Sequence, residues 1–167
     1  MKRRQLVQGL GSIAALGAVA TLGGCATTSG ASRGHVVVVG GGYGGATASK
    51  YVRKLSEYKI DVTLVEPNPM FVSCPMSNLV IGGLRTMGDI TNPYDGLVKN
   101  HGVKLVRDTV TGVDPAKKEV KLAGGQTLKY DKLVLAPGID FMWDRIEGLQ
   151  AANAAGQILH SWKAGPE

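Results

Sequence analysis

The stretch VVVVGGGYGGA, Val36–Ala46, decides the fold of this 167-residue chain. Its four consecutive valines are typical of a strand that is buried on both faces, as in a parallel sheet. Gly40, Gly42 and Gly45 then follow with the spacing G-x-G-x-x-G. In this pattern the first glycine permits a tight turn, the second lets the backbone approach a pyrophosphate, and the third lets a helix pack closely on the strand. We expect that helix at about residues 44–55, with its free N–H groups and the positive end of its dipole directed at the phosphates.

A second strand and an acidic residue support the glycine motif. The next apolar run, residues 61–65, is predicted to form a strand, and Glu66 follows it directly. Glu66 lies about 20 residues beyond the last glycine, where a carboxylate can bind the ribose hydroxyls of an adenosine. Because strand, glycine turn, helix, strand and acid follow one another in this order, we predict a dinucleotide site and not a glycine-rich turn without a ligand.

The remaining strands are expected in the second half of the chain. Apolar or alternating runs predict them at residues 103–106, 109–113, 119–122 and 128–135. Gly124-Gly125 separates the last two runs, which is a hairpin signal. We therefore expect a β-hairpin inserted into a sheet whose other strands are mainly parallel.

A second motif, TLKYDKLVLAPG at Thr127–Gly138, decides between dinucleotides. It resembles the strand and turn that close the FAD domain in flavoproteins with two dinucleotide-binding folds. The resemblance implies that the final turn, Ala136, Pro137 and Gly138, passes near the flavin nucleotide, and it favours FAD over NAD. The predicted fold class is α/β: a three-layer, Rossmann-like FAD-binding domain with a mainly parallel sheet and a β-hairpin insertion, at residues 35–165.

Cys74 lies in a segment with the features of a constrained loop. Residues 67–83 contain two early prolines and then the step Cys74-Pro75, and prolines in this arrangement disfavour a regular element. A loop that follows the second strand lies at the carboxyl edge of the sheet, where open α/β folds bind ligands. Cys74 is therefore either a thiol near the cofactor or a small buried side chain with a packing role.

The stretch SCPMSNLVIGG, Ser73–Gly83, resembles the flavin-attachment segment in the flavoprotein subunit of flavocytochrome c sulfide dehydrogenases. Three further stretches are similar to the same family: residues 94–97, 136–139 and 160–165. The resemblance covers essentially all of residues 35–165. It implies that Cys74 bonds the 8α-methyl group of FAD as a thioether. Such a bond prevents loss of the flavin outside the cell and shifts its redox potential.

The resemblance also implies an activity, the oxidation of a small sulfur substrate such as sulfide, with electrons passed to a cytochrome c subunit or a soluble cytochrome c. In that family a redox-active disulfide over the flavin accepts the sulfur nucleophile. The sequence has 2 cysteines, Cys25 and Cys74, and neither matches that disulfide. We therefore expect no catalytic residue on this chain. It resembles the amino-terminal part of a longer enzyme, with an incomplete domain, and is expected to be inactive alone.

Two other functions stay open on the sequence. One is a sulfide:quinone or NADH-dehydrogenase-like flavoprotein, which holds FAD without a covalent bond and reacts with a quinone instead of cytochrome c. The other is a non-catalytic flavin-binding or electron-relay domain. Covalent flavin on Cys74 would distinguish the sulfide dehydrogenase-like enzyme from the flavoprotein that holds FAD without a covalent bond.

Residues 1–31 have the layout of an export signal: a basic start, a stretch at residues 6–24 rich in Ala, Gly and Leu, and small residues after it. Arg3-Arg4 resembles the twin-arginine signal, which directs folded, cofactor-loaded proteins out of the cytoplasm. LGGC, which ends at Cys25, resembles a lipobox, in which the cysteine becomes lipidated; the alternative is cleavage after Ala31. We expect a periplasmic protein that is attached to a membrane only if Cys25 is lipidated.

Composition and charge exclude several other classes of protein. Lys2, Arg3 and Arg4 account for half of the net charge of +6, and no run of basic residues interleaved with aromatic ones remains. We therefore expect no nucleic-acid binding. The hydrophobic fraction of 44% and the charged fraction of 19% exclude a disordered polyelectrolyte. With 2 Cys and 3 widely spaced His, a metal site is not expected.

Overall fold

The computed structural model describes residues 32–160 and residue 165. The predicted export signal at residues 1–31, including the lipobox cysteine Cys25, lies outside this part of the chain, as do residues 161–164. Export and lipidation therefore stay predictions. Among the helices of the described residues, none has the length and the apolar character that crossing a membrane requires.

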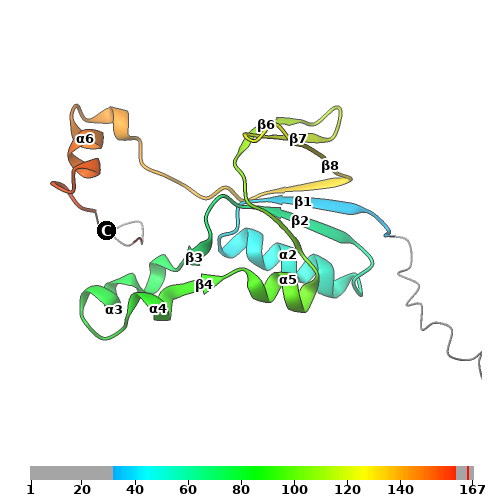
Figure 1. Ribbon diagram of the computed structural model, residues 1–167, viewed down its shortest axis with the longest axis horizontal. Helices are drawn as coiled ribbons and strands as arrows, with labels where there is room; N and C mark the ends of the chain where they lie inside the picture. The colour runs from blue at the N-terminus through cyan, green and yellow to red at the C-terminus, as the bar shows by residue number, and fades with distance from the viewer. Residues whose placement is uncertain (1–31, 161–164, 166–167) are drawn as a thin grey trace, which may run out of the picture. The chain divides into compact units, whose positions relative to one another are not determined.

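A four-stranded parallel sheet organises the described residues, with its strands in the order β5-β2-β1-β9 (Figure 1). In that order the strands span Lys104–Val106, Asp61–Val65, His35–Val39 and Lys132–Leu135. In the register of the sheet, Val38 lies between Leu64 of β2 and Val134 of β9. The predicted α/β class with a mainly parallel sheet is confirmed.

Both faces of β1 are covered, as its run of valines predicts. Val37 and Val38 are both fully buried, although successive side chains of a strand point to opposite faces. Helices α2 (Tyr43–Leu55) and α5 (Asp95–His101) cover one face (Figure 1). Val38 belongs to an apolar cluster that includes side chains from both helices, so the helix layer is packed directly on the sheet.

The opposite face is covered by a second, antiparallel sheet with the strand order β6-β7-β8 (Figure 1). Its strands span Val110–Asp114, Glu119–Leu122 and Thr127–Lys129. Val120 and Leu128 from this sheet form a buried cluster with Val37 of β1. The predicted hairpin insertion is therefore present as β7 and β8, and β6 extends it into a complete third layer.

The prediction of one strand at residues 128–135 is wrong. The chain turns between β8 and β9, so the first half of the run joins the antiparallel sheet and the second half joins the parallel sheet. The Asp131 carboxylate accepts a hydrogen bond from the His35 N–H at 2.7 Å, and the Asp131 N–H donates to the His35 carbonyl at 2.8 Å. These two bonds anchor the start of β9 beside β1. Beyond β9 lie the 3₁₀ helix η2 (Trp143–Arg145) and α6 (Leu149–Ala154).

The prediction of a constrained loop without regular elements at residues 67–83 is also wrong. The segment contains, in order, β3 (Met70–Val72), the 3₁₀ helix η1 (Cys74–Met76) and α3 (Ser77–Ile81). After them come α4 (Met87–Ile90) and β4 (Thr91–Pro93), and β4 pairs with β3 in antiparallel fashion. Pro75 does not interrupt this segment because it lies in the first turn of η1, where a missing N–H removes no helical hydrogen bond.

Alanine substitutions at Gly45 and Gly44 test the packing of α2 on the glycine turn. A Cβ atom at Gly45 would lie 1.7 Å from the carbonyl oxygen of Gly40, whereas one at Gly44 would lie 3.7 Å from the Cβ of Ala136, an ordinary contact. Helix propensity alone favours alanine over glycine by about 1 kcal/mol. We nevertheless expect Gly45→Ala to lower the free energy of unfolding by about 1–3 kcal/mol, because the backbone must shift. Gly44→Ala should leave it unchanged or raise it. Urea denaturation measures both, and equal effects would contradict this packing.

Candidate functional site

The glycine turn lies at the carboxyl edge of the parallel sheet, between β1 and α2. Gly40 has a φ of 92°, a left-handed conformation that glycine adopts without strain. A Cβ atom there would lie 2.1 Å from the carbonyl oxygen of Ala136 and 3.1 Å from the Cα of Pro137. The structure therefore brings two sequence motifs together, because the glycine turn and the turn after β9 are in backbone contact.

Gly42 precedes α2 and leaves the space in front of the helix open. Among the described residues, a Cβ atom at Gly42 would have one neighbour within 4 Å, a ring carbon of Phe71 at 4.0 Å. The first turn of α2 carries no acidic side chain, and the first N–H groups of any helix have no partner within the helix. Together with the positive end of the helix dipole, these donors form a site that favours a phosphate group.

Glu66, the predicted ribose ligand, follows β2 at the same edge of the sheet and is 7% exposed. Its Oε2 accepts a hydrogen bond from the Gly41 N–H at 2.7 Å. Its Oε1 accepts from the N–H of Asn68 at 2.8 Å and from the Asn68 side-chain amide at 2.7 Å. The side chain therefore joins the glycine turn to the end of β2. Because a carboxylate can accept about four hydrogen bonds, capacity for a ribose hydroxyl remains.

An open cavity of about 670 Å³ lies beside the glycine turn, within the size range of cofactor sites. Its lining includes three of the predicted site residues, Gly42, Cys74 and Gly138. The other lining residues are Tyr43, Phe71, Val72, Pro75, Ser77, Asn78 and Ile139. Ala136 and Pro137 contact the Gly40 turn instead. The predicted flavin-attachment cysteine and the predicted closing turn thus border the same space.

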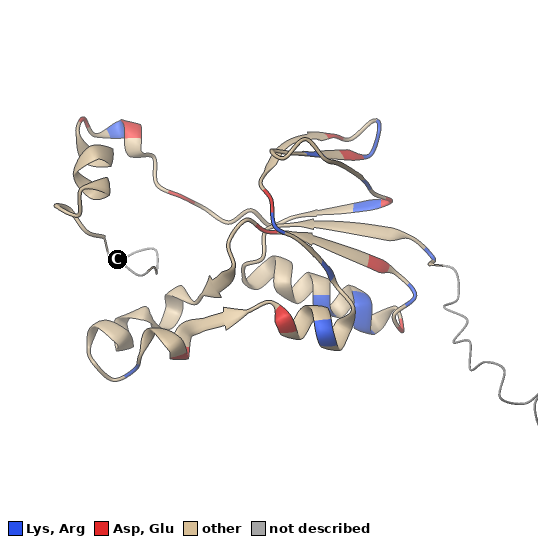
Figure 2. Ribbon diagram, in the orientation of Figure 1, with Lys and Arg blue, Asp and Glu red and all other residues tan. Residues whose placement is uncertain are grey.

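Cys74 is exposed and begins η1. Its segment is joined to the start of α2 by a hydrogen bond between the Tyr43 hydroxyl and Ser73 Oγ. The rings of Tyr43 and Phe71 also meet edge to face, with their centroids 4.8 Å apart. Figure 2 shows that β3, α3 and β4 carry no charged residue. The segment that carries Cys74 is therefore held beside the glycine turn by Tyr43, which contacts both Ser73 and Phe71. No sequence motif assigns these contacts.

Tyr94 begins the stretch 94–97 noted in the sequence, but no local pattern assigns it a role in the site. It is 4% exposed, and its hydroxyl donates to the carbonyl oxygen of Gly41 at 3.1 Å. Burial and the nearby charge of Glu66 raise the pKa of Tyr94 to about 12, against an opposite effect of Arg107. The hydroxyl is therefore protonated, and able to donate, at neutral pH. Because Tyr94 and Gly41 are 53 residues apart in the sequence, their contact depends on tertiary folding.

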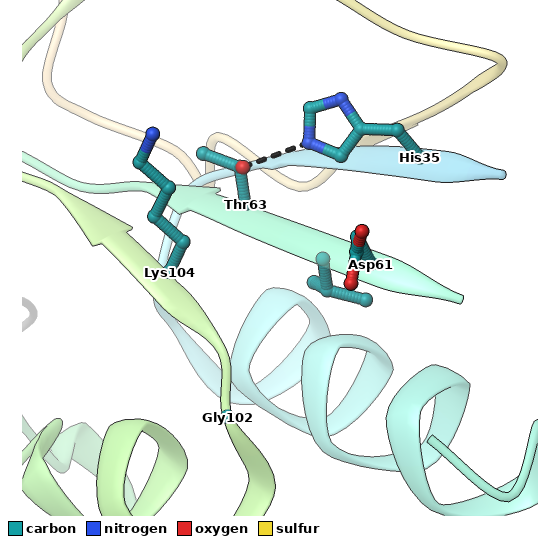
Figure 3. Close-up of a pocket in the computed structure, with 6 residues that line it drawn as sticks. His35, Asp61, Thr63, Gly102 and Lys104 are labelled. Carbon is teal, nitrogen blue, oxygen red and sulfur yellow. Dashed lines mark hydrogen bonds between the residues drawn. The ribbon is translucent and has the colours of Figure 1, made fainter. Parts of the chain in front are cut away.

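A second cavity, of about 340 Å³, lies at the amino edge of the parallel sheet (Figure 3). The first residues of β1, β2 and β5 line it, and a hydrogen bond of 2.8 Å joins His35 Nε2 to Thr63 Oγ1. Open α/β folds bind their ligands at the opposite, carboxyl edge, so we do not assign the cofactor to this cavity. In the part of the chain that the structure describes, no group of three His, Cys, Asp or Glu side chains is arranged to hold a metal ion.

The chain matches known proteins along most of its length. The family described as pyridine nucleotide-disulphide oxidoreductase matches residues 34–164. The chain is 64% identical over 45 residues, 27% of its length, to the flavoprotein chain of a sulfide dehydrogenase (flavocytochrome c) from Chlorobaculum thiosulfatiphilum, and the match covers 92% of that sequence. It is 31% identical over 115 residues to the mitochondrial sulfide:quinone oxidoreductase of Dictyostelium discoideum, over 69% of this chain and 25% of that protein.

Solved structures show the same relationship. The sulfide:quinone oxidoreductase of Aquifex aeolicus matches with a TM-score of 0.61 and 29% identity, over 65% of this chain and 25% of that one. An NAD-dependent persulfide reductase from A. fulgidus matches with a TM-score of 0.63 and 26% identity, over 70% of this chain and 24% of that one. The chain therefore spans about a quarter of the length of these larger relatives. The predicted resemblance to sulfide dehydrogenase flavoproteins is confirmed, and the chain belongs to the pyridine nucleotide-disulphide oxidoreductase family.

Proposed function

We propose that this chain supplies the FAD-binding site of a flavin-dependent oxidoreductase, of the group that includes sulfide dehydrogenases, sulfide:quinone reductases and NADH:quinone oxidoreductases. The observation that carries the proposal is the cavity beside the glycine turn, which Gly42, Cys74 and Gly138 all line. These three residues come from separate sequence motifs, each of which predicts contact with a flavin nucleotide. Relatives of all three kinds match the chain.

The residues at the carboxyl edge of the sheet fit the parts of FAD. Gly42 and the first turn of α2 hold the pyrophosphate, because a phosphate can reach the backbone there. Glu66 binds a ribose hydroxyl, because its carboxylate can accept one more hydrogen bond beside those from Gly41 and Asn68. The cavity beside Cys74 holds the isoalloxazine ring. Bound FAD supplies two-electron redox chemistry, and the residues of this chain bind and orient it.

Cys74 is proposed to bond the 8α-methyl group of the flavin. The new S–C bond replaces the Cys74 S–H bond and one methyl C–H bond. This attachment is a two-electron oxidation, so two protons would pass to solvent and two electrons to an external acceptor, dioxygen or a cytochrome. The presence of Cys74 and Gly42 around one cavity supports this assignment. The alternative, supported by the similarity to a sulfide:quinone oxidoreductase, is FAD held without a covalent bond.

We further propose that the complete enzyme is periplasmic, oxidises sulfide or a similar small sulfur compound, and passes electrons to a cytochrome c, either a subunit or a soluble protein. The 64% identity to the flavoprotein chain of a flavocytochrome c supports this acceptor. The matches to a sulfide:quinone oxidoreductase and to the type II NADH:quinone oxidoreductase of Staphylococcus haemolyticus support a quinone instead. Sulfide-dependent reduction of cytochrome c by the complete enzyme, compared with reduction of a quinone, decides between them.

Mass spectrometry of the peptide that carries Cys74 tests the covalent bond. We expect a flavin adduct on this peptide after denaturation and digestion of protein matured in its native exporting host. Cys74→Ser should release its flavin on denaturation, whereas the control Cys25→Ser should keep the adduct. An unmodified Cys74 in protein that releases FAD would favour the non-covalent alternative. Protein that holds no flavin would favour an inactive fragment.

Glu66→Gln tests the role of the carboxylate, in a Cys74→Ser background where no thioether can form. Glutamine keeps one of the two oxygens and replaces the other with an NH2 group, so a donor must face either Gly41 or Asn68, both of which already donate. We therefore expect the Kd for FAD to rise about 10- to 100-fold. Glu57→Gln is the matched control, because Glu57 is an exposed acid, and it should leave the Kd unchanged. Quenching of flavin fluorescence measures both, and an unaltered Kd in Glu66→Gln would reject this role.

A further inference from the structure

The backbone of Gly41 is held on both sides by side chains from other parts of the fold. Its N–H donates to Glu66 Oε2 at 2.7 Å, and its carbonyl oxygen accepts a hydrogen bond from the Tyr94 hydroxyl at 3.1 Å. Gly41 occupies a variable position of the G-x-G-x-x-G pattern, to which the pattern assigns no role. The bond to Glu66 orients the peptide group between Gly40 and Gly41, and the bond from Tyr94 orients the next one, between Gly41 and Gly42.

The hydrogen bond from Tyr94 determines where the next N–H group points. The Gly41 carbonyl and the Gly42 N–H belong to one planar, trans peptide group, and in such a group the C=O and N–H bonds point in opposite directions. The Gly42 N–H is therefore directed away from the Tyr94 hydroxyl. Gly42 also borders the cavity of about 670 Å³ and precedes the first turn of α2, where the site favours a phosphate.

We propose that Tyr94 is a positioning residue for the cofactor: its hydroxyl holds the Gly41–Gly42 peptide so that the Gly42 N–H is presented to the pyrophosphate. This inference rests on the proposed FAD site and adds a residue to it. Tyr94 acts through Gly41 and not by contact with the ligand. Glu66 completes the arrangement, because it holds the N–H of the same glycine.

The surroundings of Tyr94 keep its hydroxyl in place. The ring belongs to the buried cluster between the parallel sheet and its helices, which also contains Val36 and Leu64. The guanidinium group of Arg107 lies 6.0 Å from the ring centroid. A Cβ atom at Gly41 would lie 2.6 Å from the hydroxyl oxygen, so the approach of the phenol to the turn requires glycine there. The hydroxyl is thus rigidly aimed at one carbonyl group.

Tyr94→Phe separates positioning from packing, because it keeps the ring and removes the hydroxyl. FAD and ADP are titrated into the full chain in the Cys74→Ser background, where binding is reversible. We expect the Kd for both ligands to rise about 5- to 10-fold in Tyr94→Phe. Tyr51→Phe, which changes an exposed tyrosine of α2, is the matched control and should leave both values unchanged.

The Gly42 amide resonance in a ¹H–¹⁵N spectrum supplies a readout that packing alone would not move. In the parent protein, ADP should shift this resonance downfield because the N–H gains a charged acceptor. In Tyr94→Phe the resonance should differ before ADP is added, and its response to ADP should be smaller. The measurement on the parent protein needs no Tyr94 variant, so it tests the proposal even if Tyr94→Phe does not fold.

Three results would overturn the proposal. They are unchanged Kd values in Tyr94→Phe, raised values with an unaltered Gly42 resonance, and a Gly42 resonance in the parent protein that does not respond to bound ADP. A parent protein that binds neither FAD nor ADP would instead reject the proposed function. The failure of the positioning role and the failure of the FAD site are therefore distinguishable.

Discussion

Backbone contact at the glycine turn is the constraint on which the rest of the structure depends. A Cβ atom at Gly45 would lie 1.7 Å from the Gly40 carbonyl oxygen, and one at Gly40 would lie 2.1 Å from that of Ala136. These contacts hold the start of α2 and the turn after β9 together at the carboxyl edge of one sheet. The proposed cofactor site follows from them, because the helix N-terminus, Glu66 and the cavity beside Cys74 all lie at this edge.

Hydrogen bonds to side chains order the glycine turn before a ligand arrives. A buried carboxylate is unfavourable unless it is hydrogen-bonded, and Glu66 meets this condition by accepting from Gly41 and Asn68. Tyr94 binds the other side of Gly41. A stretch of glycines would otherwise lose much conformational entropy when a ligand binds. Because these hydrogen bonds already order the turn in the folded protein, part of that entropy is lost on folding and not on binding. Preorganisation of this kind raises affinity without a new contact to the ligand.

Local sequence patterns predict the parts of the fold that depend on neighbouring residues. The valine run, the glycine spacing and the position of Glu66 predict β1, α2, β2 and a site at the carboxyl edge, because periodicity and turn residues are local properties. The strand predicted at residues 128–135 is divided at Asp131, whose hydrogen bonds to His35 on another strand depend on tertiary folding. The contacts of Tyr43 and Tyr94 are not predicted from local sequence for the same reason, because each binds a residue far away in the sequence.

The position of Cys74 depends on contacts between its segment and the start of α2. Cys74 begins η1 and borders the cavity beside the glycine turn. The segment that carries Cys74 is held against α2 by the Tyr43–Ser73 hydrogen bond and the Tyr43–Phe71 ring contact. A nucleophile fixed beside its target reacts as if its concentration were far above that in solution. In the proposed flavin attachment this placement would favour reaction at Cys74, and the backbone contacts at the glycine turn hold the two sides of the proposed site together.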